Sequence, residues 1–317
     1  MENRRVALIA GLGVVELWIF GMMFRSLCGG HESRYTVVPP SSAFAAMSND
    51  ALEGRLAKTI DAGPAPHVVI DDDGATLSVS VRPGSTVAVN EETDVRGWVH
   101  GGRHPVSVER TVDGVQIVRS DNDLVVSMGL VRRQLTVVVP PAVRLEVKNA
   151  GSTTISGLRA DASIHSDDGS VVVSDVRGAV DVRTDDGRVE LHAVDAPAVE
   201  IDSDNGRVLL DRVRADRVAV TTDDGRIDVV RSLLLGGKIK TNNGRISLDL
   251  DPRSNVTVNA RASDGKVIAG APLTLISGGR DDDDAPSTIR IGSGSGRLDV
   301  GSDDGSITVS AGGVYGS

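Results

Sequence analysis

The feature that most constrains this chain is an internal repeat that starts near its middle. A turn glycine recurs every 18 to 21 residues, at Gly151, Gly169, Gly187, Gly206, Gly225, Gly244 and Gly265. The residues around it barely change: Ser or Thr, two Asp or Asn, the glycine, usually Arg, then Val or Ile. Self-similarity at a fixed period indicates a repeat fold, so each period is expected to be one structural unit stacked on the next.

Each period contains two short alternating segments, such as Val189-Glu190-Leu191 and Val199-Glu200-Ile201. Alternation with period two predicts half-buried strands with the aliphatic side chain inward. The Asp-Gly and Asn-Gly pairs are typical of tight turns. A second turn is expected midway in each period. The candidates for it are Gly178, Pro197, Ala215 and Gly236-Gly237.

Two arrangements fit this period. One is a flattened parallel solenoid with a strand of each coil on each of two facing sheets, and the other is an antiparallel meander folded into a sandwich. Near-identical turns favour stacking of like on like. We therefore predict an all-β, repetitive two-sheet β-solenoid, similar to a β-roll or β-helix, with about 18–19 residues per coil.

The flanking segments complete the predicted organisation. Residues 67–148 form an N-terminal β entry or cap region with weaker periodicity, 149–312 the β-strand repeat region, and 313–317 a tail. The alternating segments near residues 289–309 are expected to close the stack, and residues 270–287 to form an inserted loop that carries Asp281–Asp284.

Residues 1–30 are predicted to be a membrane anchor. The run Val6–Phe24 is apolar over 19 residues except for Glu16, and as a helix it would span roughly 28 Å, close to a bilayer core. Arg4 and Arg5 precede it and favour a cytoplasmic N-terminus, with the body extracytoplasmic. We thus expect a single-pass protein of the cell membrane with one N-terminal transmembrane helix.

Two other interpretations of this end stay open. One is a cleaved signal peptide with a small-residue site near Ala43, and the other is lipoprotein processing at Cys28, the only cysteine. Residues 31–66 are expected to be a flexible linker, because Gly and Pro punctuate them, with a short helix over 50–59 as an option.

The amino-acid composition argues against two classes of function, enzymes with aromatic-lined pockets and nucleic-acid-binding proteins. The chain has only 2 Trp, 2 Tyr and 3 Phe, whereas enzyme pockets usually depend on aromatic side chains. Its net charge of −10 argues against electrostatic binding to the phosphates of a nucleic acid.

The Asp-Asp-Gly turns raise the question of calcium, but Asn replaces Asp at Asn205, Asn242 and Asn243, and an Arg usually follows the glycine. His100 and His104 share a loop without a third ligand, while His165 and His192 fall at outward strand positions. No Gly-x-Ser-x-Gly nucleophile context occurs. We predict no catalytic, cofactor-binding or metal-binding residue.

The segment Leu135-Thr136-Val137-Val138-Val139-Pro140, then Leu145–Gly151, then recurrent Ser/Thr-Asp-Asp-Gly-Arg-Val units resembles the bacterial putative-adhesin β-strand-repeat family, a domain of unknown function. The resemblance covers roughly residues 67–310. The resemblance implies a membrane segment that precedes pairs of strands joined by glycine turns. It implies no catalytic residue in this chain.

The expectation is a non-enzymatic, membrane-anchored, extracytoplasmic β-repeat protein with a structural, adhesive or partner-binding role at the cell envelope. Its partner would be an envelope protein or a polysaccharide, with no nucleic acid and no cofactor, and an uncapped edge coil would allow self-association. The alternatives are a calcium-stabilised β-roll binding module, a glycan-active β-helix enzyme and an envelope-stress sensor.

Overall fold

A computed structural model describes residues 54–63, 66–72, 74–100, 105–119, 126–270, 273, 275–277 and 286–312. They belong to one compact unit, Ser48–Ser317, and form strands and one 3-10 turn, η2 (Pro252–Ser254), with no α-helix in these ranges. No helix of the described residues is long and apolar enough to cross a membrane. The expected anchor over 1–30, the Asp281–Asp284 run and the tail over 313–317 lie outside the described residues.

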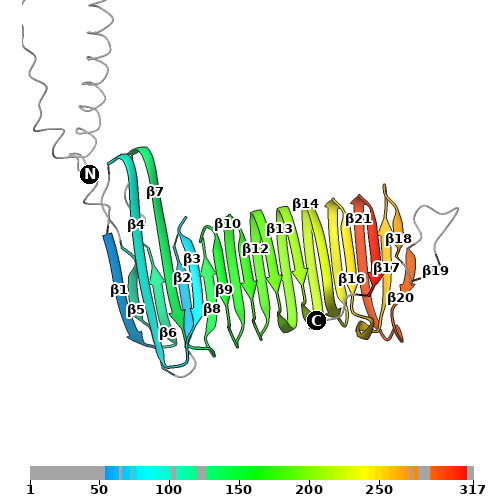
Figure 1. The fold of residues 1–317 in the computed structure, drawn as a ribbon, viewed down its shortest axis with the longest axis horizontal. Coiled ribbons are helices and arrows are strands. Elements are labelled where there is room, and N and C mark those ends of the chain that lie inside the picture. Colours follow the sequence, from blue (N-terminus) through cyan, green and yellow to red (C-terminus); the bar gives the residue numbers. More distant parts are fainter. Residues whose placement is uncertain are drawn as a thin grey trace, which may run out of the picture. The chain divides into compact units, whose positions relative to one another are not determined.

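The central coils form a parallel solenoid (Figure 1). They consist of β10 (Ala162–Asp168) with β11 (Val171–Ser174), then β12 (Val180–His192), β13 (Asp195–Asp211) and β14 (Arg214–Leu234), then β15 (Gly237–Asn243) with β16 (Ile246–Leu250). Each coil pairs with the next in parallel and like on like, for example Gly187 with Gly206 and Val189 with Val208. The parallel solenoid is therefore confirmed over the antiparallel sandwich.

Each coil contributes to two facing layers. The first layer holds β10, the first halves of β12, β13 and β14, and β15; the second holds β11, the second halves of β12, β13 and β14, and β16. Strands β12 to β14 run through the glycine turn without a break. The two expected sheets are thus one sheet that bends at this edge.

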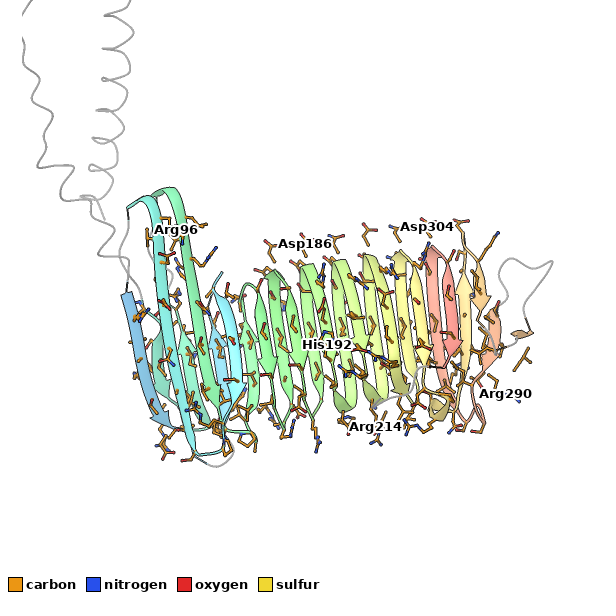
Figure 2. The ribbon with its side chains drawn as sticks, in the orientation of Figure 1. Arg96, Asp186, His192, Arg214, Arg290 and Asp304 are labelled. Atoms are coloured by element: carbon orange, nitrogen blue, oxygen red, sulfur yellow. The ribbon has the colours of Figure 1, made fainter. Side chains whose placement is uncertain are left out.

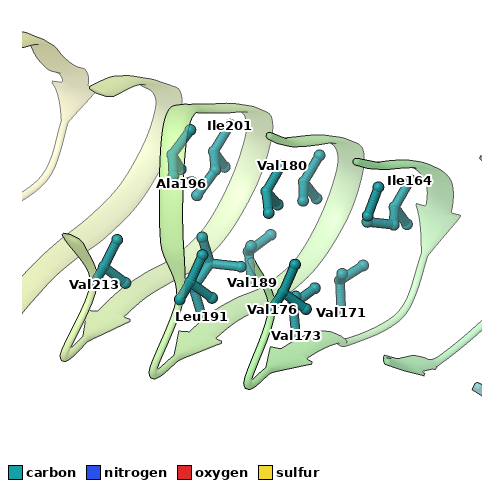
Figure 3. Close-up of a cluster of buried hydrophobic side chains, with 14 of the residues drawn as sticks. Ile164, Val171, Val173, Val176, Val180, Val189, Leu191, Ala196, Ile201 and Val213 are labelled. Carbon is teal, nitrogen blue, oxygen red and sulfur yellow. The ribbon is translucent and has the colours of Figure 1, made fainter. Parts of the chain in front are cut away.

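The core is a thin double row of aliphatic side chains between the layers (Figure 3). Ile201 on the first layer and Leu191 and Val189 on the second are all at most 1% exposed. The sequence contains no aromatic residue between Trp98 and Tyr315. A coil only two strands wide leaves room for Val, Ile and Leu and little for rings, which accounts for the low aromatic content of the repeat.

The second turn of each coil starts earlier than the sequence analysis placed it. It begins at residues with left-handed backbone, Asp175 (φ 50°), Ala193 (φ 53°), Arg212 (φ 53°) and Arg231 (φ 47°). Gly178 and Gly236 lie at bends, as expected, whereas Pro197 and Ala215 lie within β13 and β14. The residue after each of the first three left-handed residues is a fully buried valine: Val176, Val194 and Val213. Burial of this valine fixes the corner and outweighs the cost of positive φ in a residue other than glycine.

The N-terminal end departs from chain order. Strands β2 (His67–Asp71) and β3 (Thr76–Val81) pair in parallel with β8 (Arg144–Lys148) and β9 (Thr153–Ser156). On their other side they pair with β6 (Gly114–Val118) and β7 (Val126–Val139). The later coil β6–β7 therefore lies outside the earlier coil β2–β3.

Three antiparallel strands complete this end. β4 (Thr86–His100) pairs with β7, β1 (Gly54–Asp61) with β4, and β5 (Ser107–Arg110) with β6. The optional helix over 50–59 is wrong for the described part, because residues 54–61 form β1. A short isolated helix is only marginally stable in water, so the pairing of all eight residues of β1 with β4 is favoured over it.

A buried ionic cluster joins three segments at this end. Arg119, after β6, donates from Nε to Asp72 Oδ1 at 2.5 Å and from Nη2 to Glu91 Oε1 at 2.8 Å. The three side chains are only 4%, 0% and 1% exposed, respectively. Glu91 Oε2 also accepts from the Val106 backbone N–H at 3.1 Å. Burial raises the pKa of Asp72 in spite of the adjacent guanidinium of Arg119.

The C-terminal end departs from chain order too. Strands β21 (Gly296–Asp304) and β22 (Ile307–Ala311) pair in parallel with β15 and β16 on one side and with β17 (Val256–Ala262) and β18 (Val267–Ala269) on the other. β20 (Ser287–Arg290) adds antiparallel to β17, and β19 (Leu275–Ser277) to β20. The expectation that the last segments close the stack is confirmed for Ile289 and Arg290 in β20 and wrong for β21 and β22, because this last coil is inserted one place inside the end.

Candidate interaction surface

The Ser or Thr that recurs in each repeat has a structural role. These residues point inward and are almost fully buried: Ser166, Thr184, Ser203, Thr222, Thr241 and Ser302. Ser166 Oγ donates to the Ala150 carbonyl at 2.7 Å, and Ser302 Oγ to the Gly244 carbonyl at 2.9 Å. The hydroxyls therefore join the turn of one coil to the turn beside it. Sequence reasoning missed this role, although the strict Ser or Thr two residues before the Asp-Gly or Asn-Gly pair was the signal for it.

The turn glycines allow coils to approach closely. A Cβ on Gly206 would overlap the carbonyl oxygen of Gly187, and one on Gly305 would overlap that of Gly244. A Cβ on Gly265 would in turn overlap the carbonyl oxygen of Gly305. The glycine column thus follows the spatial order of the coils and not their order in the chain.

The exposed Asp and Asn residues of the turns form a ladder along one edge, where Asp186 and Asp304 are labelled in Figure 2. Asn205 Nδ2 donates to Asp186 Oδ1 and Asn242 Nδ2 to Asp223 Oδ1, each at 2.8 Å. Amides between carboxylates relieve the like-charge repulsion of stacked Asp residues. Within the described ranges no group of three or more His, Cys, Asp or Glu side chains is placed to hold a metal ion.

The arginines that follow the glycines stack on the outside of the second layer. Arg188, Arg207 and Arg226 occupy equivalent positions on β12, β13 and β14. The buried carboxylate of Asp228 accepts from Arg207 Nη2 and from Arg226 Nε, each at 2.7 Å. Two members of this column are therefore tied to one carboxylate of their own surface.

Beside that column, His192 lies between two carboxylates, and its label marks this part of the surface in Figure 2. Its Nε2 is 3.2 Å from Glu190 Oε2 and its Nδ1 3.6 Å from Asp211 Oδ2. Partial burial acts to raise the pKa of Asp211, but the hydrogen bond and charge of Arg231 (2.7 Å), with Arg212 and His192, lower it overall. The partners of His192 are carboxylates, which suit an ion-pair network rather than nucleophile activation.

Two of the shallow grooves on the outer face of the first layer differ in charge. The first, about 460 Å³, lies over β2, β8, β10, β12 and β13, and its lining includes the half-buried Ala179 and Ala198. Carboxylates of Asp181 and Glu200 line it.

At its rim, Glu146 is held by Lys148 at 2.9 Å and His67 at 3.2 Å. The Lys148 hydrogen bond is the main cause of the lowered pKa of Glu146.

The second groove, about 550 Å³, lies over β15, β21 and β17 and is called the basic groove here. Its lining includes four cationic side chains, Lys238, Lys240, Arg261 and Arg297. Two carboxylates also line it, Asp299 and Asp303. Asp299 accepts from Asn259 Nδ2 and from Arg297 Nε, both at 2.9 Å. Burial acts to raise the pKa of Asp299, but these hydrogen bonds and the charges of Arg297 and Lys238 lower it overall.

This chain was compared with known protein families, curated proteins and solved structures. The family model described as toastrack DUF4097 matches residues 85–310. Among curated proteins, none matches this chain.

Two solved bacterial structures are similar to it. One is described as a putative cell adhesion protein from Clostridium sporogenes, with 10% identity, a TM-score of 0.31, and coverage of 82% of this chain and 100% of that one. The other is described as a putative adhesin from Bacteroides fragilis, with 11% identity, a TM-score of 0.39, and coverage of 82% and 98%. No functional conclusion follows from likenesses at this level.

Proposed function

This chain belongs to the toastrack DUF4097 family, and from that premise we propose that it is a non-enzymatic, membrane-anchored β-repeat protein that binds a partner outside the cytoplasmic membrane. The observation that carries the proposal is the like-on-like parallel register of β12, β13 and β14. It places equivalent outward side chains about 4.8 Å apart along the layers. Such a surface suits a repetitive partner, because many weak contacts add through multivalency.

The chemistry of the described polar groups supports a binding role over catalysis. The buried cluster of Arg119, Asp72 and Glu91 is less than 5% exposed, so no substrate reaches it. The exposed charges are repeated and paired along the surface, as in Arg207 and Arg226 on Asp228. A catalytic site would instead concentrate groups with shifted pKa values in one cleft.

The membrane and topology parts of the proposal rest on Val6–Phe24 with Arg4 and Arg5 ahead of it. The test uses the full chain with a C-terminal tag in intact cells treated with a protease. We expect the tagged body to be digested without cell lysis. Deletion of residues 1–30 should abolish membrane fractionation of the protein. Protection of the body in intact cells, or unchanged membrane fractionation of the deletion variant, would overturn the proposed topology and anchoring.

A further inference from the structure

We propose that the basic groove over β15, β21 and β17 binds an acidic group, a carboxylate or a phosphate, of a linear acidic polysaccharide. This names the ligand class of the partner-binding role above and rests on that role. The groove stands out because it holds four cations against two carboxylates in a chain whose net charge is −10.

The floor of the groove is open at one residue. In the strand register, Gly301 on β21 lies between Lys240 on β15 and Arg261 on β17. A Cβ on Gly301 would meet only Lys240 Cγ, at an ordinary 3.7 Å. The missing side chain therefore leaves a space flanked by an ammonium and a guanidinium, which is the arrangement that an oxyanion needs.

The cations of the groove are not all neutralised. Arg297 is engaged with Asp299 at 2.9 Å, and Lys240 lies 3.6 Å from Asp303. In the described part of the chain, neither Lys238 nor Arg261 has a carboxylate within ion-pair distance. The groove thus keeps a positive surplus, and Lys238 and Arg261 are available to a ligand.

Charge along the same layer favours a sparsely charged polymer. Further along the layer, on the far side of β14, strands β13 and β12 present Glu200, Asp202 and Asp181 outward. Duplex DNA, with a charge per about 1.7 Å, would meet these carboxylates if it lay along the layer. An acidic polysaccharide with at most one acidic group per sugar has a lower charge density than duplex DNA, so it meets less repulsion from these carboxylates when one of its groups occupies the basic groove.

The size of the groove also fits one or two sugar units. Its volume of about 550 Å³ lies within the usual range for ligand sites, roughly 300–1,000 Å³. The lining contains no aromatic side chain, so recognition would depend on charge and hydrogen bonds and not on stacking against a sugar ring.

The test measures affinity of the purified full chain, in detergent micelles, for three polymers at low and moderate salt. Polygalacturonate probes a carboxylate, phosphorylated dextran probes a phosphate, and unmodified dextran is the neutral control. We expect salt-sensitive binding to at least one acidic polymer and none to dextran. The acidic polymer that binds identifies the source of the oxyanion.

Two variants of the groove act by different means. Lys238→Gln with Arg261→Gln removes the two cations that have no carboxylate of a described residue within ion-pair distance and should weaken binding by about tenfold or more. Gly301→Leu fills the open space without changing any charge and should weaken binding to a similar extent. Matched controls are Arg183→Gln on the same layer and Arg188→Gln on the other layer, both exposed; each should bind within about twofold of the unmodified chain. Circular dichroism and thermal unfolding confirm that each variant folds.

Failure of both acidic polymers to bind would overturn the inference, as would equal losses in groove and control variants. Binding of duplex DNA or of phosphatidylglycerol vesicles through the groove, without polysaccharide binding, would also overturn it. These outcomes are independent of the protease result in cells, so failure of the groove proposal is distinguishable from failure of the proposed topology.

Discussion

The central coils and the N-terminal end of the solenoid bury polar groups in two different ways. In β12, β13 and β14 each coil buries the hydroxyl of its repeat, Thr184, Ser203 or Thr222, and each of these three donates to turn carbonyls close to it. At the N-terminal end a single charged group, Arg119, neutralises Asp72 and Glu91 from segments 47 and 28 residues away.

The difference shows how stability is distributed. In the central coils it is spread over many similar small contributions, as in other repeat proteins. At the N-terminal end it depends on one cluster, because removal of one partner leaves uncompensated charge in the interior.

The largest effect is expected from Arg119→Met. The substitution keeps much of the side-chain volume but leaves Asp72 and Glu91, 0% and 1% exposed, without their cation. We expect a loss of about 3–5 kcal/mol in the free energy of unfolding. Hydrogen exchange should show that the loss is concentrated in the first coils and not in β13 and β14.

The matched control for that variant is Arg188→Met, at an arginine that is 59% exposed. Its effect should stay within about 0.5 kcal/mol. Similar losses for both variants would contradict the contrast between the two regions.

A smaller effect is expected from Gly206→Ala in the central coils. Gly206 has φ 140°, and a Cβ there would overlap the Gly187 carbonyl oxygen. We expect a loss of about 2–3 kcal/mol in denaturant unfolding, with enhanced hydrogen exchange at the two coils that the turn joins. Gly301→Ala, which meets only Lys240 Cγ at 3.7 Å, should be close to neutral. If Gly206→Ala is equally neutral, close stacking does not require glycine in this column.

The smallest effect concerns pH. The pKa of Asp211 is lowered in the folded chain, so its ionised form adds stability above the ordinary value of 3.8, and this stability is lost as the pH falls through the folded value. Asp211→Asn should cost about 1 kcal/mol at pH 7, and the difference from the unmodified chain should shrink below about pH 4.

The pKa of Asp72 is shifted in the opposite direction to that of Asp211. Its pKa is raised, so its contribution to stability falls as the pH rises from 3.8 through the folded value. Unfolding measured between pH 3 and 7 on Asp211→Asn and on Asp72→Asn separates the two regions. The same direction of pH dependence in both variants would be inconsistent with the assigned shifts.

Much of the repeat could be predicted from local pattern. The alternation in Val189-Glu190-Leu191 and the recurrent glycine predicted the strands and the period, and the near-identical turns favoured the solenoid over the sandwich. The Asn residues that argued against a calcium ladder donate to the carboxylates beside them, as Asn205 does to Asp186. These features depend on contacts between equivalent positions of neighbouring coils, which a periodic sequence displays directly.

Other features could not be predicted because their causes are not local. The corner at Ala193 has no turn residue of the usual kind; the burial of Val194 decides it. The cluster of Arg119 with Asp72 and Glu91 joins residues that no motif connects. The basic groove needs Lys240, Gly301 and Arg261 side by side, although in the chain Arg261 comes between the other two.

The sequence by itself therefore determined the content of each coil: which residues point inward, where the glycine turn falls and which side chains stack in columns. Only the tertiary structure decided the order of the coils, with β6–β7 outside β2–β3 and β21–β22 inside β17–β18. The physical reason is that coils with the same pattern offer each other equivalent edges. Pairing energy alone does not then favour chain order, and the choice depends on long-range contacts at the two ends of the stack.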